Sequence, residues 1–412
     1  MERISRHYEI RLVAILCVTI GIVNCEMFGI NYLMPFIEPA LHLNNSQVGI
    51  LGSAYWVAFA LSSYLGGALA DRLGKSKTVL QYTLVLFSVT SVLSGFATSF
   101  LGLLAARVVM GLLEGPAYLL PQSIIAAASP VERSGMNMGI VQNVGNLLSG
   151  VIAPLLLVAL ATRYNWRIGF FIIALPGLIC AAMVAFFTRE PVAHGTPAHG
   201  GEAPRPDGAA GLRGILRSRN IWLCVGGGCC FIGYITIIYG FLPLFLTQMR
   251  HFSPAQMSVI MSVLGVSGLV LGVTLPAVSD RTGRKPLMVV TGLMGVIVPL
   301  AAMFYLGPLT ILAVFTFIGW ALAGASPVIM ATIPSESVPV RSISTAIGLL
   351  IAVSTLVGGV AGPALAGWSA DRWSLAIPMW LAAGCCVIIA ALSVALYETA
   401  PAKIKCVPIQ IR

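Results

Sequence analysis

Two charged side chains interrupt the apolar run from Leu101 to Ala128, which is long enough to cross a bilayer, since about 20 residues suffice. They are Arg107 and Glu114. A charge near the bilayer centre costs roughly 2.5–3.5 kcal/mol even on the mildest scale, so such residues usually have a function. A guanidinium is a permanently charged donor for an anion, whereas a carboxyl group can carry a proton. The pair therefore indicates a site that moves a negatively charged solute.

The spacing around the two charges places them on one helix face. Residues on this face step by four and three positions: Arg107, Gly111, Glu114, Tyr118 and Pro121. Arg107 and Glu114 are separated by roughly 10 Å along the helix axis, so we expect them to face one shared site rather than to pair. Tyr118 is a candidate substrate contact on the same face.

A third charge, Glu26, lies in the first apolar run, nine residues before Pro35. Counted from the outer end of its run, Arg107 lies at a similar depth, so a contact between Glu26 and Arg107 is feasible. A carboxyl group removed from water favours its neutral form unless a cation holds it ionised. Glu26 and Glu114 are therefore candidate proton carriers, and Arg107 is the candidate anion ligand. A purely structural buried ion pair is the alternative.

Neutral polar side chains within the apolar runs supply further candidate substrate contacts: Asn24, Gln142, Asn146, Tyr234 and Tyr239. Hydrogen bonding between helices explains such residues as often as ligand contact does. Asn24 and Glu26 are two residues apart and point roughly 200° away from each other on a regular helix. The two side chains should therefore not share a cavity.

The composition, 58% hydrophobic and 9% charged, predicts an all-α membrane protein, because soluble domains carry about 25% charged residues. Apolar runs separated by charged or Gly/Pro breaks give twelve candidate transmembrane helices: 12–36, 48–70, 78–98, 101–128, 135–161, 166–188, 220–247, 254–279, 286–306, 309–334, 343–368 and 374–397.

The net charge of +10 is explained by the distribution of basic residues across a membrane and does not indicate nucleic-acid binding. With the N-terminus in the cytoplasm, four of the 24 Lys and Arg residues face outside (Arg163, Arg167, Arg250, Arg372), Arg107 lies within a span, and the other 19 face the cytoplasm. This is the positive-inside pattern. We therefore expect a multi-pass protein of the plasma (bacterial inner) membrane with both termini cytoplasmic.

No residue pattern indicates an enzyme, a metal site or a cofactor. The nine cysteines lack metal-ligand spacing, and most lie within spans, where they are expected to be small packing residues. No nucleophile–base set occurs in a segment that could face a cavity.

The two halves of the chain are related by a constant offset of 209 residues. Asp71-Arg72-Leu-Gly74-Lys75 recurs as Asp280-Arg281-Thr-Gly283-Arg284, and the same offset pairs Gln47 with Gln256 and Pro154 with Pro363. This predicts two pseudo-symmetric six-helix bundles with the binding site between them. The expected domains are a first bundle at 1–188, a cytoplasmic linker at 189–219, a second bundle at 220–397 and a tail at 398–412.

The motif that begins at Gly67 and runs through Asp71 and Arg72 resembles the signature of the major facilitator superfamily, and its second copy supports the resemblance. The resemblance covers nearly the whole chain and implies the major facilitator fold. We interpret the two copies as a cytoplasmic latch that favours the outward-facing state; the alternative is that their charges only mark topology. The latch residues are Gly67, Asp71, Arg72, Gly74, Asp280, Arg281, Gly283 and Arg284.

Features that occur twice belong to the scaffold, whereas features of a binding site need not repeat. The offset maps Arg107 to Thr316, Glu114 to Ala323, Glu26 to Ile235, Gln142 to Ile351 and Asn146 to Thr355. Every ionisable group deep in the membrane thus lies in the first half. The second half should line the binding site mostly with apolar and aromatic side chains.

The run Arg107-x-x-x-Gly111-x-x-Glu114-Gly-Pro, with Asn165-Trp-Arg before the sixth span, resembles the anion:cation symporters, which transport organic acids and phosphate-like anions. The resemblance implies that Arg107 is the substrate-side arginine, Glu114 the protonatable glutamate of span 4, and Glu26 the acid of an Asp-Arg pair. Met27 stands where that pair's arginine would be. With one intramembrane cation instead of two, a monoanion fits better than a dicarboxylate.

The predicted function is therefore proton-coupled symport of a small organic anion, such as a monocarboxylate or sugar acid, by alternating access. Sodium is not excluded as the coupling ion, and a monomer is expected. The alternative is a drug or metabolite:proton antiporter. Such exporters usually carry Gly-Pro-x-x-Gly-Gly on span 5, where this chain has Gly150-Val-Ile-Ala-Pro154.

Overall fold

The computed structural model describes residues 6–190, 215, 218–339 and 342–400, without the side chains of 67, 68, 71, 131, 132, 134, 135 and 344. In this part of the chain, 12 helices are long and apolar enough to cross a membrane. They coincide with the twelve predicted runs, so the predicted all-α architecture is confirmed.

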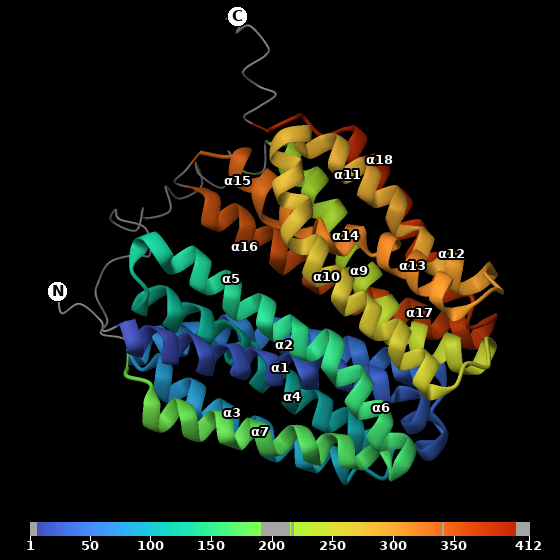
Figure 1. Ribbon diagram of the computed structural model, residues 1–412, viewed down its shortest axis with the longest axis horizontal. Helices are drawn as coiled ribbons and strands as arrows, with labels where there is room; N and C mark the ends of the chain where they lie inside the picture. Colours follow the sequence, from blue (N-terminus) through green and yellow to red (C-terminus); the bar gives the residue numbers. More distant parts are fainter. Residues whose placement is uncertain (1–5, 191–214, 216–217, 340–341, 401–412) are drawn as a thin grey trace, which may run out of the picture. The chain divides into compact units, whose positions relative to one another are not determined.

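Helices α1 to α7 form the six spans of the first half, with the fifth interrupted by a π-helical turn (Figure 1): α1 (Arg6–Leu41), α2 (Asn45–Leu73), α3 (Ser76–Gly95), α4 (Phe100–Ala128), α5 (Val131–Leu147) with η1 (Leu148–Ile152) and α6 (Ala153–Arg163), and α7 (Trp166–Phe187).

The spans of the second half are more often interrupted: α9 (Arg219–Leu244) with η2 (Phe245–Met249), α10 (Pro254–Thr282), α11 (Arg284–Gly295) with α12 (Ile297–Phe304), α13 (Leu309–Gly319) with α14 (Ala321–Gly324), η3 (Val328–Thr332) and α15 (Ile333–Glu336), α16 (Ile343–Ser354) with η5 (Thr355–Gly359) and α17 (Val360–Arg372), and α18 (Ile377–Val394).

The chain forms two compact units. The first is Met1–Glu202 with His251–Gly265, and the second is Ala203–Arg250 with Val266–Arg412. Most of the predicted linker 189–219 and of the tail 398–412 lies outside the described residues. The three boundaries between the four predicted segments therefore remain predictions.

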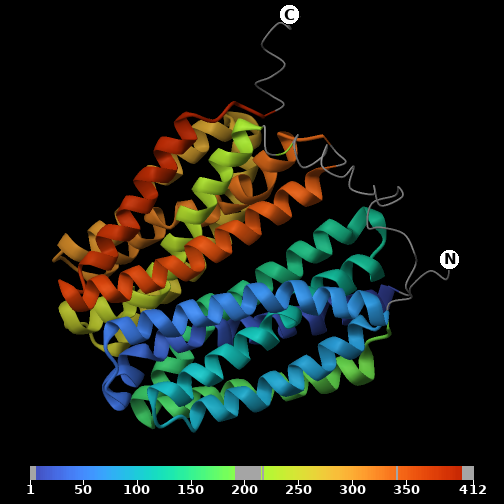
Figure 2. The same ribbon diagram turned by 180° about the vertical axis from the view of Figure 1, so that it is seen from behind.

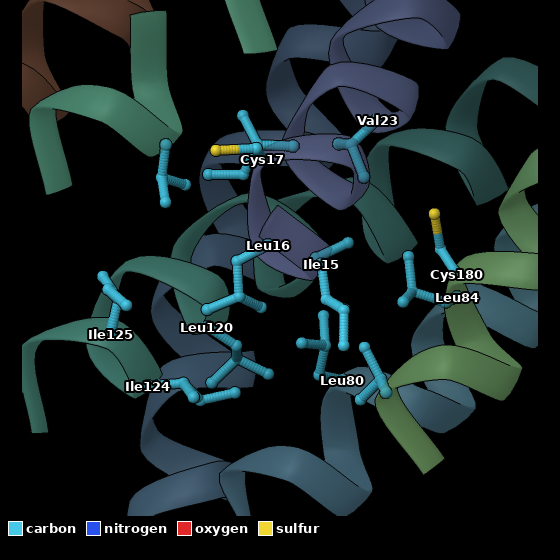
Figure 3. Packing of buried hydrophobic residues seen from close by; sticks show 14 of the residues in the cluster. Ile15, Leu16, Cys17, Val23, Leu80, Leu84, Leu120, Ile124, Ile125 and Cys180 are labelled. Carbon is cyan, nitrogen blue, oxygen red and sulfur yellow. The ribbon is translucent and has the colours of Figure 1, made fainter. Parts of the chain in front are cut away.

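Helix α1 is the centre of the first unit. It packs against α4, α5 and α7, while α2 packs on α4 and α3 on α7 (Figures 1 and 2). One end of this unit is a continuous apolar core of residues from α1, α3, α4 and α7, including Leu16, Leu80, Leu120 and Cys180 (Figure 3). This packing fixes the faces that α1 and α4 present to each other farther along their length.

Helix α9 has the corresponding place in the second unit. It packs against α16, α17 and α18, and α11 packs on α18. The pairs α1–α5 and α1–α7 thus have counterparts in α9–α16 and α9–α18. The internal repeat therefore appears in the helix packing of each unit as well as in the sequence.

The repeated glutamines Gln47 and Gln256 have a capping function. Gln47 Oε1 accepts the Asn44 N–H at 3.0 Å, and Asn44 Oδ1 accepts the Gln47 N–H at 2.8 Å. Ser253 and Gln256 exchange the same two bonds, at 3.0 and 3.2 Å. Each pair is a capping box that satisfies exposed N–H groups where a span begins, at α2 and at α10.

The repeated prolines Pro154 and Pro363 follow π-helical turns. Turn η1 (Leu148–Ile152) precedes Pro154, and η5 (Thr355–Gly359) precedes Pro363. Proline has no N–H for the regular i to i−4 bond, so the hydrogen-bond ladder changes register near it. Both halves therefore interrupt the regular hydrogen-bond ladder of the corresponding span at the same place.

Candidate functional site

Arg107 of α4 and Glu26 of α1 lie against each other, as their depths predicted. Arg107 Nη1 is 4.0 Å from Glu26 Oε1, and the two side chains are 3% and 0% exposed. This separation is an ionic contact but is too long for a hydrogen bond. The guanidinium is therefore close enough to balance the carboxylate while keeping a donor available.

Tyr55 of α2 connects Arg107 to Glu114. Its hydroxyl donates a hydrogen bond to Glu114 Oε2, and the Arg107 guanidinium carbon lies 4.5 Å from the centre of its ring. A cation over a tyrosine ring is attracted by the negative face of the ring, and more strongly where water is absent. The tyrosine thus holds the guanidinium on one face and the carboxylate at its tip.

Two glycines of α4 let α2 come close enough for this arrangement. A Cβ added at Gly111 would lie 2.6 Å from the Tyr55 carbonyl oxygen, and one added at Gly115 would lie 2.6 Å from the Ser63 nitrogen. Pairs of glycines four residues apart allow this kind of close helix approach in membranes. Any larger residue at these positions would push Tyr55 away from both charges.

Ser91 of α3 completes the surroundings of Glu26. Its hydroxyl oxygen lies 3.0 Å from both Glu26 Oε2 and the Phe170 carbonyl oxygen. Sequence reasoning missed Ser91 and Tyr55, because a neutral serine or tyrosine in an apolar run does not stand out. The Gly111-x-x-x-Gly115 spacing was the one signal that a helix must pack closely beside Glu114.

Each charged member of this cluster has an atom without a hydrogen-bond partner. Among the described residues, the buried atoms Glu26 Oε1, Arg107 Nη1 and Glu114 Oε1 make no hydrogen bond. Buried polar atoms in proteins are nearly always paired, and an unpaired charged one is costly. The cluster therefore has unused capacity to bind an anion at the guanidinium and protons at the carboxyl groups.

The predicted polar residues of α1, α4 and α5 form a separate hydrogen-bonded chain. Asn24 donates to Asn146 at 3.2 Å, Gln142 donates to Asn146 at 3.3 Å, and Gln122 donates to Gln142 at 3.1 Å. Tyr118 also bonds to Gln142. Asn24 thus points to α5 while Glu26 points to α3 and α4, as the two-residue spacing predicted. Sequence reasoning did not identify Gln122, although it lies one turn after Tyr118.

The loop motifs are built on glycines with positive φ. Gly74 has φ +60° and Gly283 has φ +110°, a conformation that L side chains rarely adopt, so the repeated motif requires glycine here. Arg72 is exposed, and the surroundings of Gly67 and the side chain of Asp71 lie outside the described set. The latch itself stays a prediction for these residues.

In the second copy of the motif, the charges are paired within their own unit. Arg284 Nη1 is 2.5 Å from Asp280 Oδ1, and Arg284 Nη2 is 3.0 Å from Glu336 Oε1. Arg281 is exposed. Arg284 therefore ties the start of α11 to Asp280 of α10 and to Glu336 of α15, whatever part these charges play in a latch.

A carboxylate caps the helix that follows the motif in each half. Glu190 accepts the Lys77 N–H at 2.7 Å and the Thr78 N–H at 3.3 Å at the start of α3. Glu398 accepts the Arg284 N–H at 2.8 Å and the Lys285 N–H at 3.2 Å at the start of α11. Burial alone would raise the pKa of Glu398, but these and neighbouring backbone N–H groups lower it overall.

Comparison with known proteins is consistent with this arrangement of spans and motifs. The profile described as Major Facilitator Superfamily matches residues 16–358 and 279–409. The chain belongs to the major facilitator superfamily. Members of this superfamily are transporters, so the protein is a multi-pass integral membrane transporter and not an enzyme.

Two relatives within the superfamily are named for organic anions. The chain is 26% identical over 403 residues to the hexuronate transporter of Bacillus subtilis, covering 91% of each protein. It is also 26% identical over 364 residues to the cis,cis-muconate transport protein of Acinetobacter baylyi, covering 86% of each. Among solved structures, a bacterial homologue of the human lysosomal transporter Spinster matches with a TM-score of 0.77 at 19% identity, over 97% of this chain and 98% of that one. The last likeness concerns the fold alone.

In the second unit of this major facilitator protein, the two predicted tyrosines surround Trp320. Tyr234 lies with its ring centre 5.4 Å from that of Trp320, and Tyr239 at 5.6 Å. Tyr234 is fully buried and its hydroxyl donates to the Gly295 carbonyl at 3.3 Å. Tyr239 is partly exposed. Within the unit, Tyr234 is thus a packed residue, and Tyr239 is the more accessible of the two.

Proposed function

We propose that this major facilitator transporter takes up a small organic monoanion, such as a monocarboxylate or sugar acid, together with a proton. Arg107 binds the anion, and Glu26 and Glu114 carry protons. The observation that supports this most directly is that these three groups are buried in one cluster, each with an atom free of hydrogen bonds. Such an arrangement is costly for stability alone, which favours a functional reason for it.

The charge count of the cluster favours a monoanion. With both carboxyl groups ionised, two negative charges surround one guanidinium, and one bound proton makes the cluster neutral. A monoanion at Arg107 adds one negative charge, and one further proton restores neutrality. A dianion would leave a net charge even with both carboxyl groups protonated, which is unfavourable at low dielectric. The expected stoichiometry is one proton taken up with each anion.

The neighbouring residue Met27 supports the same substrate class. It is buried beside Glu26, at the position where the anion:cation symporters have a second arginine. Without that second cation, the cluster has one permanent positive charge to offer. The names of the relatives, which refer to hexuronate and cis,cis-muconate, support an organic anion as the class of substrate. Hexuronate carries one carboxylate and cis,cis-muconate carries two, so the preference for a monoanion rests on the charges of the cluster and not on these names.

The remaining predicted residues have supporting parts in this proposal. The amide chain of Asn24, Gln142 and Asn146, with Tyr118, offers hydrogen bonds to polar groups of the substrate, and Tyr239 and Tyr234 contribute aromatic surface. Transport follows alternating access of the two predicted bundles, with Asp71, Arg72, Asp280 and Arg281 in the cytoplasmic latch. The proposed location is the plasma (bacterial inner) membrane with both termini cytoplasmic.

Glu114→Gln tests the coupling. We assign the transported proton to Glu114 and expect Glu26 to keep its protonation state during the cycle. In liposomes that contain the purified variant, accumulation of a labelled monocarboxylate driven by an imposed pH gradient should then be lost, because the amide cannot exchange a proton. Exchange of internal for external anion should continue, which also shows that the variant is folded. If gradient-driven accumulation survives unchanged, Glu114 is not the coupling site.

A further inference from the structure

A second cluster of positive charge lies at the ends of α1 and α7 and has no part in the proposed transport site. Arg11 and Arg189 both lie beside the Tyr8 ring, with guanidinium carbons 5.8 and 5.4 Å from its centre. The Arg189 N–H also donates to the Tyr8 hydroxyl at 2.8 Å. The second ring beside Arg11 is Phe187, at 5.4 Å. Both arginines are exposed.

The carboxylates nearest in sequence are bound to other donors. Glu9 pairs with Arg133 at 2.9 Å and accepts from Asn137 at 2.7 Å. Glu190 accepts the backbone N–H groups at the start of α3. Within the described segments, neither Arg11 nor Arg189 has a carboxylate within ion-pair distance. The two guanidiniums therefore keep most of their donors for a ligand.

The surface beside these arginines is apolar. Phe186 is 82% exposed, Phe187 47% and Ile10 61%. In a protein that spans the membrane, exposed phenylalanines at the last turn of a span contact lipid acyl chains. Arginines and a tyrosine directly beyond them lie at the depth of the lipid headgroups. A ligand for this surface must combine an apolar body with an anionic head.

We infer that Arg11, Arg189 and Tyr8 bind the phosphate of an anionic phospholipid whose acyl chains lie along Phe186 and Phe187. A guanidinium can donate two parallel hydrogen bonds to phosphate oxygens, and two guanidiniums beside the same ring can both reach one headgroup. Basic pockets between transmembrane helices at a membrane surface are a known form of lipid recognition. The inference requires only that the protein spans the membrane, and it holds whether or not the transport proposal is correct.

The internal repeat offers a natural comparison. In the second unit, Arg219 stacks on Tyr397 at 5.0 Å and donates to its hydroxyl at 3.2 Å, at the corresponding ends of α9 and α18. Only one guanidinium contacts the ring there among the described residues. Within the described residues, the two-arginine arrangement therefore occurs in the first unit only.

The test is binding of dioleoyl phosphatidylglycerol to the purified full-length protein in neutral detergent, measured by native mass spectrometry. Arg11→Gln with Arg189→Gln should weaken binding of the tightest lipid roughly thirtyfold, since each arginine near a headgroup contributes about fivefold. The control is Arg163→Gln with Arg372→Gln, which makes the same charge change at two exposed, repeat-related arginines. Its affinity should stay within about threefold of the original.

Three further arms decide the outcome. Dioleoyl phosphatidylcholine should bind more weakly than phosphatidylglycerol, and millimolar inorganic phosphate should not displace the lipid, because it lacks acyl chains. Arg11→Lys with Arg189→Lys keeps the charge and the fold but loses the planar fork, and it should retain part of the affinity. Unchanged lipid binding in the glutamine double variant, equal loss in the control, or displacement by phosphate would each overturn the inference.

Discussion

The two halves of this transporter share a scaffold but differ in the interior of their spans. In the first, Arg107, Glu26 and Glu114 are buried together around Tyr55. The repeat-related positions in the second half are Thr316, Ile235 and Ala323. Thr316 is buried and bonds only to the Leu312 carbonyl of its own helix, at 2.8 Å. A similar helix packing thus surrounds a charged cluster in one half and uncharged residues at the matching positions in the other.

Four features that occur in both halves serve the helices themselves. They are the capping boxes at Gln47 and Gln256, the π-helical turns before Pro154 and Pro363, the positive-φ glycines Gly74 and Gly283, and the carboxylate caps Glu190 and Glu398. None of them lies among the buried charges. The comparison of the halves therefore separates the residues that stabilise the helices from the residues that we propose to bind the anion and the proton.

The largest difference between the halves is expected when one residue is substituted in each half at a matched pair of positions. Arg107→Gln removes the one buried cation of the cluster and leaves the anion without a charged partner. Because removing one partner of a buried charge pair costs about 2–5 kcal/mol of binding, uptake of the monoanion should fall roughly thirtyfold or more. Thr316→Val at the repeat-related position should change uptake by less than about threefold.

Initial uptake rates in liposomes, normalised to the amount of folded protein, measure both variants. An equal loss of uptake in the two variants would show that the charged cluster has no special role in transport. Retention of uptake in Arg107→Gln would remove the proposed anion ligand.

Tyr55→Phe sharpens the comparison within the first half. The variant keeps the ring beneath Arg107 but removes the hydroxyl that donates to Glu114. A hydrogen bond to a charged group contributes about 1.5–3 kcal/mol, so the ionised carboxylate loses much of its support. The pH at which uptake is half-maximal should therefore move upward by about one unit. A pH profile of uptake from pH 5 to 9 checks this, and an unchanged profile with a reduced rate would mean that Tyr55 only packs.

Glu398→Gln and Glu190→Gln each remove the carboxylate that caps a helix of the shared scaffold. Their effects on melting temperature should be small and nearly equal in the two halves. Losing a helix cap costs about 1 kcal/mol, so each variant should melt a few degrees lower at pH 7 with uptake nearly unchanged. The pKa of Glu398 is lowered in the folded protein, so its contribution is present above the unfolded value of about 4.3 and is lost as the pH falls. The difference in melting temperature between the original protein and Glu398→Gln should therefore close at acidic pH. A difference that persists there would contradict the assigned role of Glu398.

The spans, the repeat and the buried charges could be predicted from sequence, because each of them has a direct physical cause that leaves a clear pattern. Long apolar runs must cross the membrane, and the constant offset between Asp71 and Asp280 gave the repeat. A charge inside a span is costly enough that Arg107, Glu26 and Glu114 stood out. Counting residues from the ends of the runs placed Glu26 and Arg107 at one depth, and the structure brings them together.

What sequence could not supply was the rotation and neighbour of each helix. Tyr55 and Ser91 carry no charge, so only the packing of α2 and α3 shows that they contact the carboxyl groups. Gln142 and Asn146 were identified, but not that they bond to each other and to Gln122. Tyr234 appeared equivalent to Tyr239 in sequence, yet its hydroxyl is occupied by the Gly295 carbonyl. These facts depend on contacts between distant segments.

The central claim is that one guanidinium and two carboxyl groups in the first half move one monoanion with one proton. The most direct measurement is uptake of a labelled monocarboxylate into liposomes under an imposed membrane potential, with proton movement recorded at the same time by a trapped pH dye. The account predicts one proton for each anion and a rate independent of the potential, because the loaded cluster is neutral. Uptake that depends on the potential, or that proceeds without proton movement, would contradict it.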